Sequence, residues 1–284
     1  AMEGYRVVLI ELEDGYHKLQ RQAMEELERS IPEAKGLVTL IQGDNRLIMP
    51  IPVNHIMTSP PYCLHPDTPI LTSSLLWKPI HKVGIGEYLI GIDEYPTGGR
   101  GVKRCLRICQ VLNTTLSVQH AYKIQFSDGR SVTCSSNHRW LTKQNGGTAM
   151  IWVETHKLIA GNQIRCLTNC TWAEDKSYEA GYIAGLYDGE GWVDAHGGTQ
   201  VRFKQKIGNI SSYVENYLKS QGYHPGFQVH EPTEMVGINL SNLNDCLKFI
   251  GSHRPQRLLP TLVNTIPGKT LGKNLLTTIV SIEP

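Results

Sequence analysis

Four groups of residues in this chain of 284 have types and spacings that could do chemistry. Cys63 carries a thiol, which can attack a neighbouring carbonyl and convert an amide into a thioester. His138 stands three residues after Ser135, and a histidine can protonate a leaving amine near neutral pH. Glu190 ends an expected helix that contains the small residues Ala184 and Gly185, and its carboxylate suits a divalent cation. A fourth group alternates along the strand-like segment Val201–Ile207, so that its side chains face one way and could meet phosphates. It consists of Arg202, Lys204 and Lys206.

The bulk composition is that of a globular protein with hydrophobic cores, because 40% of the residues are hydrophobic and the net charge is only +2. The length allows one large domain or two to three small ones. No run of 18 or more apolar residues occurs, so we expect no membrane span. The N-terminal segment lacks the features of a signal peptide, which predicts an intracellular, cytoplasmic protein with reduced thiols.

The seven cysteines do not suggest a metal centre or a disulfide framework. Their odd number argues against a closed set of disulfides. Cys105 and Cys109 lie in a strand-like segment, which would separate their sulfurs by roughly 13 Å along one face. Cys166 and Cys170 have the same spacing. We therefore expect buried structural cysteines and no zinc.

The elements that must position these groups fall into three blocks of different character. Residues 1–62 alternate strand and helix with apolar strands, which is typical of a parallel α/β, Rossmann-like sheet. The expected strands and helix are Tyr5–Leu12, Gly15–Ser30, Leu37–Gln42 and Asn54–Met57. Residues 63–170 consist of short strand-like segments separated by turn signals such as Ser127-Asp128-Gly129, which predicts an all-β fold.

The third block, residues 171–284, has an α+β pattern. The first expected helix runs over Ser177–Tyr187, and a second follows a Ser212-x-x-Glu215 capping box and stops before Gly222. A third helix should run from a Ser241 cap to Gly251. Strand-like segments lie between the helices, at Gln200–Ile207, Phe227–His230 and Met235–Leu240.

The end of the first block resembles the catalytic motif of amino-group DNA methyltransferases. It reads Ser59-Pro60-Pro61-Tyr62 after an apolar strand. In that family such a loop holds the amine of a flipped base, and the aromatic residue stacks on it. The resemblance implies that Glu11 and Asp44 would contact the ribose and adenine of S-adenosylmethionine. Because the glycine-rich cofactor loop expected before Tyr5 is absent, we expect cofactor binding only by the intact, spliced host.

The segment that directly follows Tyr62 resembles the first block of inteins: it reads Cys63-Leu64-His65-Pro66-Asp67-Thr68-Pro69-Ile70. Residues 129–138 resemble the second block, with Ser135 in place of the threonine in the family's Thr-x-x-His pattern. The resemblance implies a β-rich Hint splicing fold over 63–170. Tyr62–Cys63 would be the scissile junction, where Cys63 attacks and His138 acts as the general acid. Ser135 would donate a hydrogen bond that orients the scissile peptide or stabilises its oxyanion.

The last residues, 277–284, resemble the start of the next-to-last strand of inteins. This resemblance implies that 273–284 begin the C-terminal splicing segment. The terminal His-Asn pair of the family and the nucleophile after it are not found here. We therefore expect complete splicing to require a further intein segment and a C-terminal host fragment as partners.

The segment Ile183-Ala184-Gly185-Leu186-Tyr187-Asp188-Gly189-Glu190-Gly191 resembles the LAGLIDADG motif of homing endonucleases. The resemblance implies an endonuclease domain over 171–272 that cuts double-stranded DNA with Mg2+ bound at Glu190. The family also has a curved sheet in the major groove, which assigns DNA contacts to Arg202, Lys204 and Lys206. Gln205 would lie near the catalytic water, Arg254 and Arg257 would add phosphate contacts, and a family lysine aligns with Asn244.

A single such motif implies a homodimer through the Ala184 and Gly185 face of the helix, because cutting both strands needs two carboxylates. The sequence thus predicts an intein of prokaryotic or phage type with an inserted endonuclease, interrupting a methyltransferase. Two alternatives stay open. One is a methyltransferase in which 63–284 is an accessory DNA-recognition region, and the other is a degenerate element that only binds DNA.

Overall fold

The structure, a computed structural model, describes residues 6–11, 14–43, 63–96, 104–114, 116, 118–143, 149–196, 198–270 and 275–284. It divides into two compact units, residues 1–59 and 60–284. Asp44, the Asn54–Met57 segment and Ser59, Pro60, Pro61 and Tyr62 lie outside the described residues. No helix in the described part of the chain is long and apolar enough to cross a lipid bilayer.

The first unit contains a β-α-β arrangement with parallel strands, as the sequence predicts. β1 (Val7–Glu11) pairs in parallel with β2 (Val38–Gln42), and α1 (Asp14–Ser30) connects them. A helical crossover is what two adjacent parallel strands require. The register places Glu11 opposite Gln42, and Gly43 N donates to the Glu11 carbonyl over 2.9 Å. Glu11 therefore lies at the carboxyl edge of both strands.

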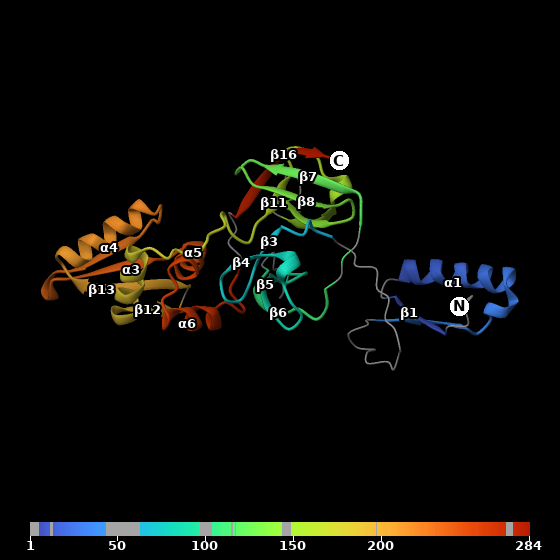
Figure 1. Ribbon diagram of the computed structural model, residues 1–284, viewed down its shortest axis with the longest axis horizontal. Helices are drawn as coiled ribbons and strands as arrows, with labels where there is room; N and C mark the ends of the chain where they lie inside the picture. The colour runs from blue at the N-terminus through green and yellow to red at the C-terminus, as the bar shows by residue number, and fades with distance from the viewer. Residues whose placement is uncertain are drawn as a thin grey trace. The chain divides into compact units, whose positions relative to one another are not determined.

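A six-stranded antiparallel sheet forms part of the second unit, in the order β10-β9-β11-β16-β7-β8. Its strands are β7 (Ala121–Phe126), β8 (Ser131–Ser135), β9 (Arg139–Lys143), β10 (Met150–Glu154), β11 (Gln163–Arg165) and β16 (Leu276–Glu283). The expected turn joins β7 to β8, with Gly129 at a φ of 83°, which favours glycine. β16 is the last strand of the chain, yet it lies between β11 and β7 (Figure 1). The chain therefore leaves this sheet after β11 and returns to its middle.

Two hairpins precede the sheet. They are β3 (Pro69–Leu71) with β4 (Trp77–Pro79), and β5 (Tyr88–Ile92) with β6 (Leu106–Gln110). The described residues of 63–170 contain strands and single 3-10 turns, and no α-helix. β6 is held from outside the hairpin, because Leu106 N donates to the Lys269 carbonyl over 2.8 Å and Gly268 N donates to the Leu106 carbonyl over 3.0 Å.

The remaining part is α+β. A four-stranded antiparallel sheet has the order β12-β13-β15-β14, formed by β12 (Gly191–Asp194), β13 (Gln200–Lys206), β14 (Gly226–His230) and β15 (Met235–Leu240). The helices are α3 (Tyr178–Glu190), α4 (Asn209–Ser220), α5 (Leu243–His253) and α6 (Leu258–Thr265). Figure 1 shows α3 and α4 beside β13. The sequence did not predict β12 or α6. α4 begins earlier than expected, where the Ser211 hydroxyl accepts from Gly208 N over 3.0 Å.

One hydrophobic cluster contains buried residues from the hairpins and from the α+β part, including Leu71, Leu75, Ile90, Leu106, Trp172, Ile183, Tyr187, Phe203, Phe249 and Leu262. A hydrogen bond of 2.9 Å from Trp172 Nε1 to the Leu75 carbonyl crosses this cluster. A side chain at Gly251 would overlap Trp172 Nε1 and lie 2.6 Å from the Leu75 oxygen. The hairpins therefore pack directly on α5, at a point where only glycine fits. A second cluster fills the six-stranded sheet.

Candidate functional site

Cys63 begins a short edge segment that pairs with β8. Ser135 N donates to the Cys63 carbonyl over 2.9 Å, and His65 N donates to the Thr133 carbonyl over 2.8 Å. Leu64 forms an antiparallel bridge with Cys134 and packs into the cluster of the six-stranded sheet. Burial of Leu64 sets the register of this segment, because a shift by one residue would turn it outward. That register places Cys63 beside Ser135, which lies 72 residues further along the chain.

The Ser135 hydroxyl contacts the nitrogen of Cys63. It accepts a hydrogen bond from Cys63 N over 3.1 Å and donates one to Asn137 Oδ1 over 2.7 Å. A hydroxyl has one proton to donate in a hydrogen bond, and here that hydrogen bond goes to Asn137. Ser135 is 2% exposed, so water does not compete for these contacts. The sequence assigned Ser135 the role of a donor to the scissile peptide or its oxyanion. In the structure it is an acceptor for the peptide nitrogen instead.

His138 is held by its backbone and is largely buried. Its N–H donates to the Ser135 carbonyl over 3.1 Å, and its ring packs edge-on against Trp140 at 5.0 Å between centroids. Burial lowers the pKa of His138 to about 4. The ring is therefore neutral at pH 7, whereas the sequence assigned it the part of an acid near neutral pH. A neutral imidazole can still carry a proton from one group to another.

Thr155, in a 3-10 turn over Thr155–Lys157, connects the residues behind this site. Its N–H and hydroxyl both donate to the His138 carbonyl, over 2.8 and 3.1 Å. The same hydroxyl accepts from Trp140 Nε1 over 3.0 Å and lies 3.2 Å from Cys134 Sγ. Sequence reasoning missed both Thr155 and Asn137. Asn137 could have been found from its place two residues after Ser135, since such spacing suits a local side-chain hydrogen bond.

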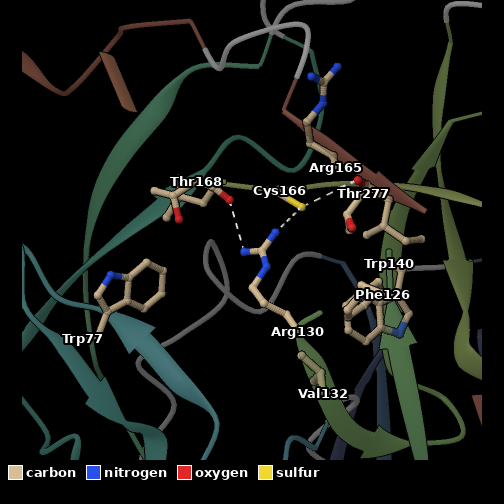
Figure 2. Close-up of a pocket in the computed structure, with 11 residues that line it drawn as sticks. Trp77, Phe126, Arg130, Val132, Trp140, Arg165, Cys166, Thr168 and Thr277 are labelled. Carbon is tan, nitrogen blue, oxygen red and sulfur yellow. Dashed lines mark hydrogen bonds between the residues drawn. The ribbon is translucent and has the colours of Figure 1, made fainter. Parts of the chain in front are cut away.

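A cavity of about 180 Å³ lies on the same sheet, lined by Trp77, Phe126, Arg130, Val132, Trp140, Ile164, Arg165, Cys166, Leu167, Thr168 and Thr277. Figure 2 shows the Arg130 guanidinium directed at the Cys166 sulfur and the Thr168 carbonyl, and both contacts are 3.2 Å long. Arg130 also pairs with Asp128 at 2.6 Å. Burial opposes ionisation of Asp128, but hydrogen bonds from Arg130 outweigh it and lower the pKa of Asp128 to about 2. Arg130 therefore fastens the segment that leads out of β11.

The two cysteine pairs with zinc-like spacing, 105/109 and 166/170, lie in different segments of the chain. Cys166 is engaged by Arg130, and Cys105 and Cys109 lie at and within β6, the expected strand, but Cys109 is exposed and not buried as expected. Within the described ranges, no group of three or more His, Cys, Asp or Glu side chains could hold a metal ion.

α3 has a buried face, an exposed glycine face and an acidic end. Ser177 caps its start by accepting from Ala180 N over 3.2 Å, and Glu190 is its last residue. The buried residues are Ala180, Ile183, Ala184 and Tyr187. Gly181, Gly185 and Gly189 are exposed, and nothing lies within 4 Å of a Cβ built on any of them. The expected dimer face thus includes Gly185, but Ala184 belongs to the core of its own chain.

The open face of the four-stranded sheet carries the three basic residues of β13. Val201 and Phe203 are fully buried, so Arg202, Lys204 and Lys206 face the other way. Arg202 pairs with Asp194 at 3.0 Å and donates to Gln200 over 2.9 Å.

Gln205 has the opposite orientation to these basic residues, because it pairs in register with the buried Val236. Its side-chain oxygen accepts from Lys206 N over 2.9 Å. It lies two residues beyond Phe203, whose partner is Gly191, and so at the end of the sheet where α3 stops.

Arg254 and Arg257 were assigned to phosphate, and the structure uses both for contacts within the chain. Arg254 donates to the Ser74 carbonyl, and Arg257 donates to three carbonyls at the end of α3. Asn244, which aligns with a family lysine, is 2% exposed and bonded to Asn169. These contacts anchor the three side chains within the fold, and each guanidinium keeps N–H donors that these hydrogen bonds do not use.

No protein-family profile matches the sequence, and no curated protein sequence matches it either. Two solved structures are similar to part of the chain. One is a mutant of a variant of the Ssp DnaB mini-intein, with 19% identity and a TM-score of 0.30 over 42% of this chain and 67% of that one. The other is the Msm DnaB1 intein splicing domain bound with zinc, with 26% identity and a TM-score of 0.25 over 35% of this chain and 66% of that one. The chain spans about two thirds of each, and its structural similarity to intein splicing domains covers about 40% of its length.

Proposed function

We propose that the chain from Cys63 onward is an intein-type self-processing element whose first step is an N–S acyl shift at the Tyr62–Cys63 junction. The observation that carries this proposal is the hydrogen bond of 3.1 Å from Cys63 N to the buried Ser135 hydroxyl. It holds the nitrogen of one particular peptide bond, next to the thiol that would attack it. The antiparallel sheet around it, completed by β16, keeps that segment in register.

The step balances with one proton. A bond forms between Cys63 Sγ and the Tyr62 carbonyl carbon, the bond from that carbon to the Cys63 nitrogen breaks, and the thiol proton ends on the nitrogen. Ser135 fixes the nitrogen. Neutral His138 accepts the thiol proton and passes it to the departing amine, which needs no imidazolium in the resting state. Asn137 and Thr155 act through Ser135 and the His138 backbone, as positioning residues.

Thiol-induced cleavage tests this proposal. Dithiothreitol should release a fragment that ends at Tyr62, and Cys63→Ala should abolish its release. Ser135→Ala should slow it roughly tenfold, about 1.4 kcal/mol in the barrier, since the nitrogen of the scissile peptide would no longer be held in place. Ser135→Thr should retain most of the rate. Cys109→Ala, at an exposed cysteine on β6, is the matched control and should change nothing. Equal release from the Cys63→Ala chain would refute the assignment.

We further propose that residues 171–272 are a LAGLIDADG-type endonuclease. The specific observation is Glu190, exposed at the end of a helix whose other exposed residues include three glycines, with Lys204 and Lys206 on the open face of the adjoining sheet. Glycine faces let two helix backbones approach closely. A homodimer through this face would bring two Glu190 carboxylates together and would favour a nearly palindromic double-stranded DNA target.

Mg2+ suits the donors at this place, because Glu190 offers hard carboxylate oxygens and DNA phosphates would offer more. When bound, the ion would activate water and stabilise the leaving oxygen. Of the two acidic residues that the structure describes at the end of α3, Glu190 alone is available, because Asp188 is engaged by the N–H groups of Gln256 and Arg257. The dimer is therefore part of this proposal. Glu190→Gln should leave DNA binding and dimerisation intact and stop cleavage, whereas Gly185→Leu should separate the subunits in sedimentation runs. A strictly monomeric protein that cuts both strands would overturn it.

For residues 1–62 we propose the N-terminal part of an amino-group DNA methyltransferase, supported by the parallel β1–α1–β2 arrangement with Glu11 at its carboxyl edge. S-adenosylmethionine would bind only to the intact host. Titration calorimetry checks this, with no saturable binding expected for the present chain. Binding as tight as that of an intact methyltransferase would contradict the proposal and favour the accessory-region alternative.

A further inference from the structure

We propose that Arg257 and Asp188 are positioning residues that fix the direction of the Glu190 carboxylate. The inference rests on the proposed nuclease function and assigns Arg257 a part other than phosphate binding. The Arg257 guanidinium donates to three backbone carbonyls. Its Nε donates to the backbone carbonyl of Asp188 over 2.7 Å. Its Nη2 donates to the backbone carbonyls of Tyr187 and Gly191 over 3.2 and 2.6 Å.

The contact is reciprocal, because the Asp188 side chain caps the segment that carries Arg257. Its two carboxylate oxygens accept from Gln256 N over 2.6 Å and from Arg257 N over 2.9 Å. These N–H groups precede α6, so the carboxylate satisfies donors at a helix start. The guanidinium in turn satisfies acceptors at the end of α3, where a cation is favoured. The two residues form a clasp between the end of α3 and the start of α6.

Glu190 lies inside this clasp. α3 ends at Glu190 and β12 begins at Gly191, so no loop separates the helix from the strand. A Cβ at Gly191 would lie 2.6 Å from the Tyr187 oxygen, which shows how tightly the corner closes. The three carbonyls that Arg257 binds stand before and directly after Glu190 in the chain. With those carbonyls held, the backbone of Glu190 is held as well, and with it the direction of the Cα–Cβ bond from which the carboxylate extends.

The clasp should matter more for geometry than for stability. Arg257 is exposed and Asp188 half-buried. Hydrogen bonds at such places contribute little to folding, whereas metal-assisted chemistry is sensitive to small displacements of a ligand. Arg257→Gln and Arg257→Lys should therefore fold and dimerise. A lysine carries one point charge and cannot bridge three carbonyls, so it should rescue only part of the loss.

The test compares Arg257→Gln, Arg257→Lys and Asp188→Ala with the parent and with Lys204→Gln in the full chain. We expect single-turnover cleavage at saturating Mg2+ to fall at least tenfold in Arg257→Gln and Asp188→Ala. DNA affinity in EDTA, and the slope of its logarithm against the logarithm of salt concentration, should stay at parental values. Lys204→Gln, at a proposed phosphate contact, should instead weaken DNA binding and make the slope smaller by about one.

A readout without metal or DNA completes the test. Amide hydrogen exchange should rise at residues 188–192 in both Arg257 variants, and not at the start of α3. Parental rates of cleavage and of amide exchange in these variants would overturn the clasp. A salt slope reduced by about one in Arg257→Gln would show instead that Arg257 contacts a phosphate. A parent chain that binds DNA and never cuts it would overturn the nuclease proposal and this inference with it, a result distinct from failure of the clasp alone.

Discussion

Acidification should destabilise the second unit through one buried histidine. Burial lowers the pKa of His138 from its ordinary value of 6.5 to about 4. The unfolded chain keeps the ordinary value, so the unfolded state binds more protons between these two pKa values. Stability contributed by the neutral ring is therefore complete above pH 6.5 and is lost as the pH falls towards 4.

The size of this loss follows from the pKa difference. Each pKa unit corresponds to about 1.4 kcal/mol. Integrated from pH 7.5 to 4.5, the linkage of His138 lowers the free energy of unfolding by about 2.5 kcal/mol. Because the ring keeps some contact with solvent, which screens its charge, we expect about 2 kcal/mol.

Urea unfolding at the two pH values measures the effect, in the parent and in His138→Gln. Tryptophan fluorescence suits the assay, because Trp140 packs against the His138 ring. The parent should lose about 2 kcal/mol more than the variant between pH 7.5 and 4.5. All other titrating groups are common to both proteins and cancel in the difference. Equal losses in the two proteins, or an imidazole that titrates near pH 6.5 by NMR, would refute the reasoning.

Three further predictions concern Thr155, Gly251 and the pH dependence of cleavage at Cys63. Thr155→Val should lower the free energy of unfolding by about 2–3 kcal/mol, since it strands the Trp140 N–H, and Thr155→Ser should cost far less. Gly251→Ala should destabilise by about 3 kcal/mol, although alanine favours a helix by about 1 kcal/mol, because the new methyl overlaps Trp172. A higher melting temperature in Gly251→Ala than in the parent would contradict this packing. Hydroxylamine cleavage at Cys63, divided by that of a reference thioester, should increase from about pH 3 to 5 and then level off, because neutral His138 carries the proton. A rate that falls tenfold per pH unit above about pH 4 would require the imidazolium instead.

The sequence predicted strands with clear alternation, and it predicted the helices more closely than their caps. Met235–Leu240 is β15 with the expected bounds, whereas Asn242 and not Ser241 caps α5, and α4 begins at Asn209, ahead of the expected Ser212 box. β12 has only four residues and no turn before it, so no periodicity could reveal it. The helix α6 has eight residues, one of them Pro260, and is too short for a periodic signal.

The candidate residues could be named from the sequence, but their hydrogen-bond roles could not. Ser135 accepts from Cys63 N because its own O–H is directed to Asn137, whose side-chain oxygen accepts that hydrogen bond. The neutral state of His138 depends on burial, which a motif does not encode. Arg257 resembles any basic surface residue until the fold places it beside the end of α3, 66 residues earlier at Gly191. Contacts of this range depend on tertiary packing, and local pattern carries no information about them.

The central claim is that Cys63 attacks the carbonyl before it, and trapping the product tests it most directly. Hydroxylamine converts a thioester to a hydroxamic acid, so intact-mass measurement should find residues 1–62 ending in a Tyr62 hydroxamate. The complementary fragment should begin with a free Cys63 amine, and neither species should form from Cys63→Ala. Cleavage at any other bond, or the same two products from Cys63→Ala, would contradict the account.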